Sequence, residues 1–284
     1  MMQAVQRKPG RSVGGQIGLG IFTVLFVLMI VAPFVWLLLA AFKSGKELYS
    51  MPVQILPSSF NLQNFKDAFS VQPLLTYIVN SIVVAVVSTV LIIIIASLVS
   101  FSLARTQIKG KRLVLLMLLS ISLLPPVTIL NPIYLMTSNL KMMNTTLGLA
   151  LVLVAIELPT AAWYLMSFFQ TIPDALEESA MIDGANVVTI FCRILMPLVA
   201  PGVFTVSIMT FIAVWNNYLF ASVLNPSKKA RTVTVALTMY AGETTTPWNT
   251  IAAAAIVACV PLVIMVLICQ RRIVSGMVDG AVKG

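Results

Sequence analysis

Six long apolar stretches are the feature that most constrains what this chain can fold into. A helix that crosses the hydrocarbon core of a bilayer needs about 20 apolar residues, and the sequence reaches that length six times. Runs such as VLIIIIASLV lack the alternation of a membrane barrel strand. The sequence therefore predicts an all-α membrane protein. The expected spans are Ile17–Phe42, Thr76–Ala104, Leu113–Met136, Thr145–Gln170, Gly202–Leu224 and Asn249–Gln270.

The segments between the spans are too short to fold as separate domains. The segment RKPGRS precedes the first span, as in a signal peptide, but the run that follows stays uncharged from Ser12 to Phe42, which is too long for a signal sequence. In the loop after it, NLQNFKDAF indicates a short amphipathic helix from about Leu62 to Phe69. The expected parts are an N-terminal segment (1–16), a first transmembrane helix (17–42), a loop (43–75), a core of five helices (76–270) and a C-terminal tail (271–284).

The positions of lysine and arginine predict the orientation in the membrane. The short segment RTQIKGKR between the second and third spans is dense in positive charge, which favours the cytoplasmic side. Both termini and the segment 171–200 then also face the cytoplasm, and the loop 43–75 is extracytoplasmic. The net charge of +9 reflects this topology and contact with lipid headgroups, so membrane lipid is an expected partner and nucleic acid is not.

The composition excludes several kinds of catalytic and binding site. With 59% hydrophobic and 10% charged residues, the chain offers few groups for chemistry, and it has no histidine, the commonest metal ligand and general base. The three cysteines, Cys192, Cys259 and Cys269, do not have the spacing of metal ligands. The two glycine-lysine pairs lack the upstream glycine of a phosphate-binding loop. We therefore expect no catalytic residue, metal site or cofactor in this chain, which disfavours a membrane-embedded enzyme.

Four polar side chains inside the expected spans are candidates for a translocation pathway: Asn131, Glu157, Asn216 and Asn217. A charged group near the bilayer centre costs about 2.5–3.5 kcal/mol, so Glu157 should face protein or water. A carboxyl that braces a neighbouring helix beside Pro159 explains Glu157 equally well. The asparagines can bind a polar solute, but hydrogen bonds between helices are their commoner use.

Prolines and small residues indicate how the spans are shaped and packed. Each proline inside a span frees an upstream carbonyl, which must be satisfied by protein or by a water-filled path. The pair Pro125–Pro126 indicates either a cavity wall or a structural kink. Small residues at four-residue spacing allow helices to approach closely. The prolines are Pro125, Pro126, Pro132, Pro159 and Pro261, and the small residues are Ala96, Ser100, Ala104, Ala254 and Ala258.

A compact acidic segment separates the fourth and fifth spans. Pro173 suits the first turn of a helix, the carboxylates of Asp174, Glu177 and Glu178 favour its positive amino end, and Gly184 suits a left-handed exit. A second short helix, VVTIFCRILM, is expected to run into Pro197. The apolar side chains of this helix–turn–helix need cover from the protein's own helices or from another protein. They are Leu176, Met181, Ile182, Ile190, Phe191 and Ile194.

The same segment resembles the EAA loop in the permease subunits of binding-protein-dependent ABC importers. Three stretches carry the resemblance: ESA at 178–180, DGA at 183–185, and ILMP at 194–197, which begins nine residues after Ala185. Ser179 stands where the family usually has alanine, and Met196 where it has leucine. The stretches WYLMSFFQTIPDALEESAMIDGA, VWNNYLFA and QRRIVSGMVDGAVKG are similar to the carbohydrate branch of that family.

The resemblance implies a type I importer permease that moves a mono- or oligosaccharide across a bacterial cytoplasmic membrane by alternating access. It implies a second homologous permease subunit, two ATP-binding cassette subunits that bind ATP and Mg, and an extracytoplasmic solute-binding protein. The EAA loop would couple this chain to an ATPase subunit through Glu178, Ser179, Ala180, Asp183 and Gly184, with Ala185 as support. The alternative is an ion-coupled secondary transporter of small polar solutes, which would normally carry more buried ionisable groups.

Overall fold

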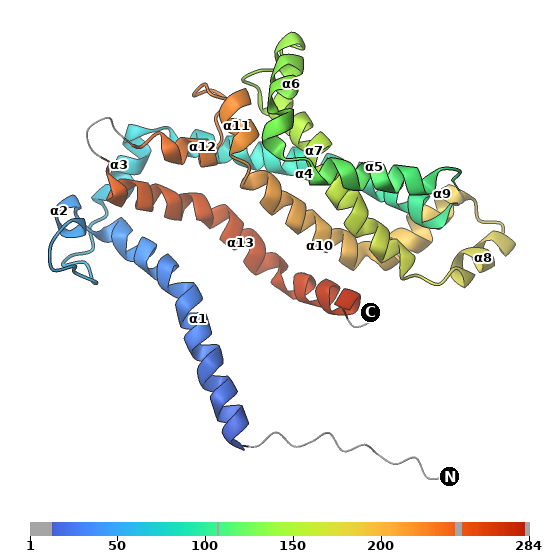
Figure 1. Ribbon diagram of the computed structural model, residues 1–284, viewed down its shortest axis with the longest axis horizontal. Helices are drawn as coiled ribbons and strands as arrows, with labels where there is room; N and C mark the ends of the chain where they lie inside the picture. The colour runs from blue at the N-terminus through green and yellow to red at the C-terminus, as the bar shows by residue number, and fades with distance from the viewer. Residues whose placement is uncertain (1–12, 107, 242–245, 282–284) are drawn as a thin grey trace.

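The computed structural model describes residues 13–106, 108–241 and 246–281, with side chains placed from Ile17 to Cys269 within these ranges. Residues 1–12 of the predicted N-terminal segment and 282–284 of the predicted tail lie outside them. Every regular element in the described ranges is a helix (Figure 1). The helices are α1 (Val13–Phe42), α2 (Gly45–Leu48), α3 (Gln63–Val71), α4 (Leu74–Arg105), α5 (Lys111–Leu123), α6 (Pro126–Asn139), α7 (Thr146–Gln170), α8 (Ala175–Ile182), α9 (Val187–Thr189), the π-helical η1 (Ile190–Leu195), α10 (Met196–Trp215), α11 (Leu219–Leu224), α12 (Val233–Thr238) and α13 (Trp248–Ala281).

The prediction of membrane-spanning helices is confirmed for most of the chain. Five helical segments in the described ranges are long and apolar enough to cross a bilayer, and the bent pair of α5 and α6 forms either a broken sixth span or a re-entrant loop. Helices α4 and α7 start and end within two residues of the predicted second and fourth spans. Thr145 caps the start of α7, since its hydroxyl accepts the N–H of Gly148 at 2.9 Å. The predicted amphipathic helix is also present, as α3.

The core lies where α4 packs along α7, with α10 against both (Figure 1). Small residues permit this close approach, as the four-residue spacing predicts. The buried hydroxyls of Ser88 and Ser100 on α4 donate to the carbonyls of Ala150 and Ala162 on α7, at 3.1 and 2.7 Å. Hydrogen bonds therefore hold the two helices together inside an apolar core.

The third span is not one straight helix, which corrects the prediction for Leu113–Met136. The helix stops at Leu123, Leu124 takes an extended conformation, and α6 starts at Pro126 at an angle of 96° to α5. Pro125 and Pro126 cannot donate the backbone hydrogen bonds that would continue α5, which explains the break. Helix α5 lies along α7, whereas α6 projects away from it and meets α11 (Figure 1).

The fifth span is displaced toward the N-terminus from the predicted Gly202–Leu224. The helix of VVTIFCRILM does not end at Pro197 but continues without a break from Val187 to Trp215. Pro197 is tolerated in the first turn of α10, and the π-helical turns of η1 precede it. Helix α10 comes so close to α7 that a Cβ added at Gly202 would lie 2.4 Å from the Phe168 ring.

The first helix stands apart from this core. Helix α1 contacts α13 and α3, and its far end diverges from the other helices in Figure 1. Only its C-terminal part is buried, where Ala40 and Ala41 pack against Ala252 and Ala253 of α13. Most of its large apolar side chains are exposed, as expected for a helix that lipid or another subunit surrounds.

Candidate functional site

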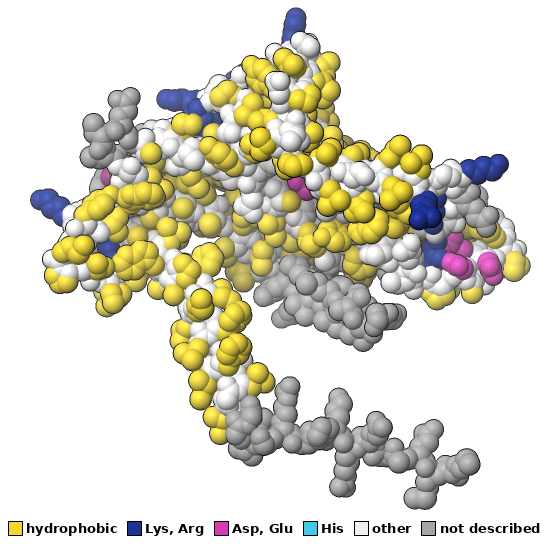
Figure 2. Space-filling model, viewed as in Figure 1, with side chains coloured by type: hydrophobic (Ala, Val, Ile, Leu, Met, Phe, Trp, Pro, Cys, Tyr) yellow, Lys and Arg dark blue, Asp and Glu magenta, His cyan; other side chains and the backbone are white. Residues whose placement is uncertain are grey.

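The acidic segment forms a short helix at one end of the bundle. The predicted helix is present as α8, which carries Glu177 and Glu178 in its first turn, but it begins at Ala175, so Pro173 precedes the helix rather than standing in its first turn. Acidic and basic side chains gather at its tip, while the surface of the neighbouring membrane helices is mainly hydrophobic (Figure 2). The predicted contact residues thus share one short helix and the turn that follows it.

The exit from α8 confirms the role predicted for Gly184. Its φ is +82°, in the left-handed region. The N–H of Gly184 donates to the carbonyl of Met181 at 3.0 Å, and the N–H of Ala185 donates to the carbonyl of Ala180 at 2.9 Å. These two bonds form a Schellman motif, which fixes the direction in which the chain leaves the helix. The side chain of Asn186 then caps the next helix by accepting the N–H of Thr189 at 2.8 Å.

A residue that the sequence interpretation used only for orientation, Arg105, anchors the helix. Arg105 ends α4, and its side chain is 5% exposed. Its guanidinium pairs with the exposed carboxylate of Asp174, donates to the carbonyl of Ile172, and lies 3.0 Å from Oε1 of the buried Glu177. Because Asp174 is 69 residues away in the chain, only the fold brings these charges together.

The apolar side chains of the loop divide into a covered set and an exposed set. Ile190 is buried, and Phe191 packs against the rings of Phe101 and Phe169, whose centroids lie 5.1 and 6.4 Å away. Ala180 and Ala185 join this cluster, so the inner side of α8 is anchored to the bundle. The outer side of α8 is not covered by any other described part of the chain, and Ile182 is 86% exposed. The exposed apolar residues around the turn are Leu176, Met181, Ile182, Val187 and Val188.

The other predicted contact residues lie on the outer side of the same helix. Glu178, Ser179, Asp183 and Gly184 are all exposed. The hydroxyl of Ser179 donates to the carbonyl of Ala175 within the helix, at 2.8 Å. These four residues therefore remain available to a partner, whereas Ala180 packs against the bundle on the inner side of the helix.

Burial gives Glu177 a testable dependence on pH. Desolvation raises the pKa of this carboxyl, against the lowering effect of Arg105 and with a further increase from Asp174. A raised pKa means that stability is present at low pH and is lost as pH rises through the folded-state value. Glu177→Gln should therefore flatten the decline in thermal stability of the detergent-purified protein as the pH rises above about 4.5. Glu178→Gln, on the exposed side, should leave the decline unchanged, and equal profiles in all three proteins would contradict this role of Glu177.

Glu157 lies beside a cavity between α7 and α10. The side chain is half-buried, and the cavity of about 180 Å³ is lined by both helices. Among the described residues its carboxyl accepts no hydrogen bond and forms no ion pair, and the choice between a pathway residue and a brace beside Pro159 stays a prediction. The lining residues are Glu157, Thr160, Ala161, Tyr164, Met209, Thr210 and Ala213.

The structure does not bring the three candidate asparagines to this cavity. Asn131 is exposed on α6, which turns away from α7. Asn216 and Asn217 lie just after α10 rather than within a span, which corrects their predicted position. The Asn217 side chain accepts the N–H of Phe220 at 3.2 Å, and its carbonyl accepts the Thr234 hydroxyl at 3.2 Å. These contacts begin α11 and fix α12, so Asn217 has a structural role.

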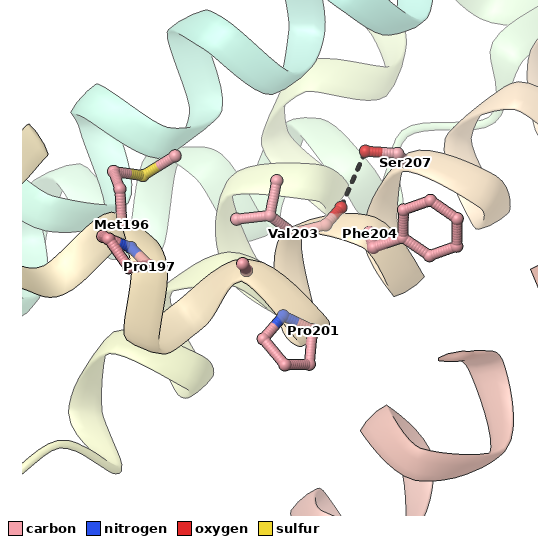
Figure 3. Close-up of a pocket in the computed structure, with 7 residues that line it drawn as sticks. Met196, Pro197, Pro201, Val203, Phe204 and Ser207 are labelled. Atoms are coloured by element: carbon pink, nitrogen blue, oxygen red, sulfur yellow. Dashed lines mark hydrogen bonds between the residues drawn. The ribbon is translucent and has the colours of Figure 1, made fainter. Parts of the chain in front are cut away.

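A larger hollow of about 500 Å³ follows the loop on α10 itself (Figure 3). Met196, Pro197, Pro201 and Phe204 surround it, and the hydroxyl of Ser207 turns back to the carbonyl of Val203 at 2.7 Å. Pro197 and Pro201 cannot donate backbone hydrogen bonds, so the carbonyls one turn before them lack their usual helical donors. The helix is therefore least regular beside the loop that joins it to α8.

Comparisons with known proteins agree with this geometry. The chain is 38% identical over 252 residues to the sulfoquinovosyl glycerol transport system permease protein SmoH of Agrobacterium fabrum, covering 89% of this chain and 88% of the relative. It is 33% identical over 265 residues to the trehalose/maltose transport system permease protein MalG of Thermococcus litoralis, covering 92% and 94%. Among solved structures, a chain of a bacterial ABC transporter involved in the import of the acidic polysaccharide alginate superposes with a TM-score of 0.79 at 20% identity, over 93% of this chain and 99% of that one.

The family description "Binding-protein-dependent transport system inner membrane component" matches residues 96–279, which include α7, the acidic loop and α10. This match covers more than half of the chain, and the relatives above are matched over nearly their whole lengths. The sequence resemblance is thereby confirmed, and so is the fold that it implies. The chain belongs to the family of binding-protein-dependent transport system inner membrane components, the permease subunits of ABC transporters.

Proposed function

We propose that this chain is the membrane-spanning half of an ATP-driven importer that carries a mono- or oligosaccharide across a bacterial cytoplasmic membrane. The curated relatives carry the names of permeases for sulfoquinovosyl glycerol and for trehalose and maltose. A solved complex of similar fold includes an alginate pentasaccharide-bound periplasmic protein, which supports a solute-binding protein as a partner. The chain itself acts as a transport subunit rather than an enzyme, and ATP and Mg bind to two partner ATPase subunits.

The observation that carries this proposal is the half-covered helix α8. Its inner side is fixed by Ala180 and by the ion pairs of Arg105, while its outer side presents Glu178 and bare apolar residues. A short amphipathic helix that is rigidly held and open on one side can dock into a groove of a partner. We assign the partner as an ATPase subunit on the cytoplasmic side, with contacts through Glu178, Ser179, Asp183 and Gly184.

The anchoring of α8 explains how such docking could move the membrane helices. The loop joins α7 to α10 directly, and Arg105 ties it to α4. Packed interfaces shift between discrete arrangements rather than deform gradually. Movement of the ATPase subunits would therefore shift three core helices together and open the pathway to the opposite side. The second permease subunit would complete that pathway.

Charge reversal on the exposed side of α8 tests this assignment. Glu178→Arg should weaken the association with the ATPase subunits about tenfold, equivalent to about 1.4 kcal/mol. The reversed charge would face the partner, because the side chain at this position is exposed and does not contact the chain's own core. Co-purification with the ATPase subunits and sugar uptake into vesicles measure the effect, while the membrane content of the variant should stay normal. Glu178→Gln, which keeps the shape, serves as the control. Normal uptake by Glu178→Arg would refute the coupling role.

The ion-coupled alternative predicts a different outcome in the same preparation. A secondary transporter would accumulate solute in vesicles without nucleotide and without other subunits. Uptake by the isolated chain that depends on a proton or sodium gradient would exclude the importer assignment, whereas strict dependence on ATP and a binding protein would support it.

A further inference from the structure

Two cavities meet on one face of α7. The first, of about 180 Å³, lies between α7 and α10 beside Glu157. The second, of about 200 Å³, lies between α7 and α5. Thr160 and Tyr164 line both cavities, so the two are separated by side chains of α7 alone. The second cavity is lined by Leu118, Leu119, Ser122, Pro159, Thr160, Trp163 and Tyr164.

The polar groups of this face are arranged as a row. Glu157, Thr160 and Tyr164 are three and four residues apart, which places them on one side of the helix, over about 10 Å at a rise of 1.5 Å per residue. The hydroxyl of Thr160 lies 3.5 Å from that of Ser122 on α5. The other sides of α7 are apolar, with Leu153, Ala162 and Leu165 buried in the core. The row is therefore the polar side of an otherwise apolar span.

The side chains of this row match the chemistry of a sugar. The half-exposed rings of Trp163 and Tyr164 offer flat apolar faces with a polar group at the edge, which suits the C–H faces of a glycosyl ring. The Glu157 carboxyl and the Thr160 hydroxyl can exchange hydrogen bonds with ring hydroxyls. Ligand sites commonly combine such apolar walls with a few well-placed polar groups, and an ionisable side chain within a span marks a functional site by default.

We propose that the row of Glu157, Thr160 and Tyr164, which lines the cavity between α7 and α10, is a sugar subsite that holds one uncharged glycosyl ring during translocation, with Trp163 in the adjoining cavity. This inference rests on the proposed function of sugar import and adds that this half of the importer contacts the sugar itself. A typical ligand pocket has a volume of about 300–1,000 Å³, and each of these cavities is smaller. The subsite therefore accommodates a single ring rather than a whole oligosaccharide.

The charge of the lining favours an uncharged ring. Among the described residues that line the two cavities, none is a lysine or an arginine, and the one carboxyl is that of Glu157. An anionic ring would enter a site of low dielectric without a cation to pair with and would meet a carboxyl. A neutral ring leaves no charge uncompensated and supplies the hydroxyl donors that Glu157 lacks among the described residues.

Protection of an introduced cysteine tests the subsite. Thr160→Cys, in a chain whose three native cysteines are replaced by alanine, is labelled with a small maleimide in the assembled complex in lipid nanodiscs. The probes are trehalose and maltose, which are neutral, and sulfoquinovosyl glycerol and an alginate trisaccharide, which carry negative charge. A transported neutral sugar should slow labelling at least fivefold, and the acidic sugars should not. Leu151→Cys, exposed on α7 outside both cavities, is the control and should be labelled at the same rate throughout.

A second variant keeps the test decisive if the cysteine impairs transport. Glu157→Gln should raise the KM for the transported sugar about tenfold, because the carboxylate accepts stronger hydrogen bonds than the amide. Asp67→Asn, outside the spans on α3, should leave this KM unchanged.

The outcomes separate the subsite from the proposed function. Labelling of Thr160→Cys at the same rate with and without a transported neutral sugar, or an unchanged KM in Glu157→Gln, overturns the subsite and leaves sugar import intact. Protection by the acidic sugars overturns the assignment to an uncharged ring. Sugar uptake by the isolated chain that needs neither ATP nor partner subunits contradicts the proposed function itself.

Discussion

Replacing Arg105 with leucine is expected to reduce sugar uptake by the assembled complex about 5- to 30-fold. The change removes the guanidinium that holds Asp174, Glu177 and the carbonyl of Ile172, and it leaves the Glu177 carboxyl buried without its cation. Breaking a buried ion pair from one side costs about 3–5 kcal/mol. Because Asp174 is 82% exposed, solvent screens its pair with Arg105, and we expect a loss of about 1–2 kcal/mol. That loss would lower the population of correctly positioned α8 about 5- to 30-fold, and uptake with it.

The measurement combines uptake, ATPase activity and thermal stability in one reconstituted preparation. If Arg105 positions α8, the complex with the variant should hydrolyse more ATP for each sugar molecule transported. The variant should still insert in the membrane. Arg112→Leu is the matched control, because Arg112 is an exposed arginine at the start of α5 that makes no ion pair within the described part of the chain. A loss of uptake in Arg112→Leu equal to that in Arg105→Leu would show that positive charge at this end matters and not the anchoring.

A double variant distinguishes anchoring from simple loss of charge. Replacing both partners of a buried pair by apolar residues is often nearly neutral, whereas removing one partner is costly. Arg105→Leu with Glu177→Leu should therefore recover a substantial part of the stability lost in Arg105→Leu alone. The coupling energy is the loss of stability in the double variant minus the sum of the losses in the two single variants. Strictly additive losses would mean that Arg105 and Glu177 do not act as a pair.

Gly184→Pro is expected to abolish uptake nearly completely. Proline fixes φ near −65°, whereas Gly184 adopts +82°, and proline also removes the N–H that donates to Met181. The Schellman motif cannot form in this variant, so the chain would leave α8 in another direction and the exposed face would no longer meet its partner.

The matched control lies at the same position. Asparagine tolerates the left-handed region better than other residues with a side chain, and no atom lies within 4 Å of a Cβ added at Gly184. Gly184→Asn should therefore keep at least half of the uptake. Uptake into vesicles and co-purification of the ATPase subunits measure both variants. Equal loss in both would show that the position tolerates no side chain, and equal retention would show that the backbone geometry of this turn is not needed.

Local patterns in the sequence predicted the elements whose cause is local. The lengths of α4 and α7 follow from apolar runs that match the thickness of a bilayer, and both were predicted within two residues. The exit of α8 follows from the requirement for glycine in the left-handed region, so Gly184 was identified correctly. The small residues of α4 predicted close packing, and Ser88 and Ser100 confirm it with hydrogen bonds to α7.

The predictions that were wrong concern breaks whose position depends on several neighbours. The proline pair was recognised as a possible kink, but the 96° bend between α5 and α6 also depends on the contacts of α5 with α7 and of α6 with α11. Asn216 and Asn217 were placed inside a span because hydropathy remains high beyond Trp215. The helix ends there because the side chain of Asn217 begins a new one, a local competition with the helix that hydropathy does not register.

By itself, the sequence determined that the chain is a membrane protein of apolar helices, the extents of α4 and α7, and which loop carries the acidic helix, since length, hydropathy and helix-end chemistry act over a few residues. Only the tertiary structure decided that Arg105 anchors this loop and that Glu157 shares a cavity with Thr210 of α10. These contacts join residues on different helices, and their geometry is set by how the helices pack. A pattern along one segment does not contain that information, because the partner that gives each buried charge its role lies elsewhere in the chain.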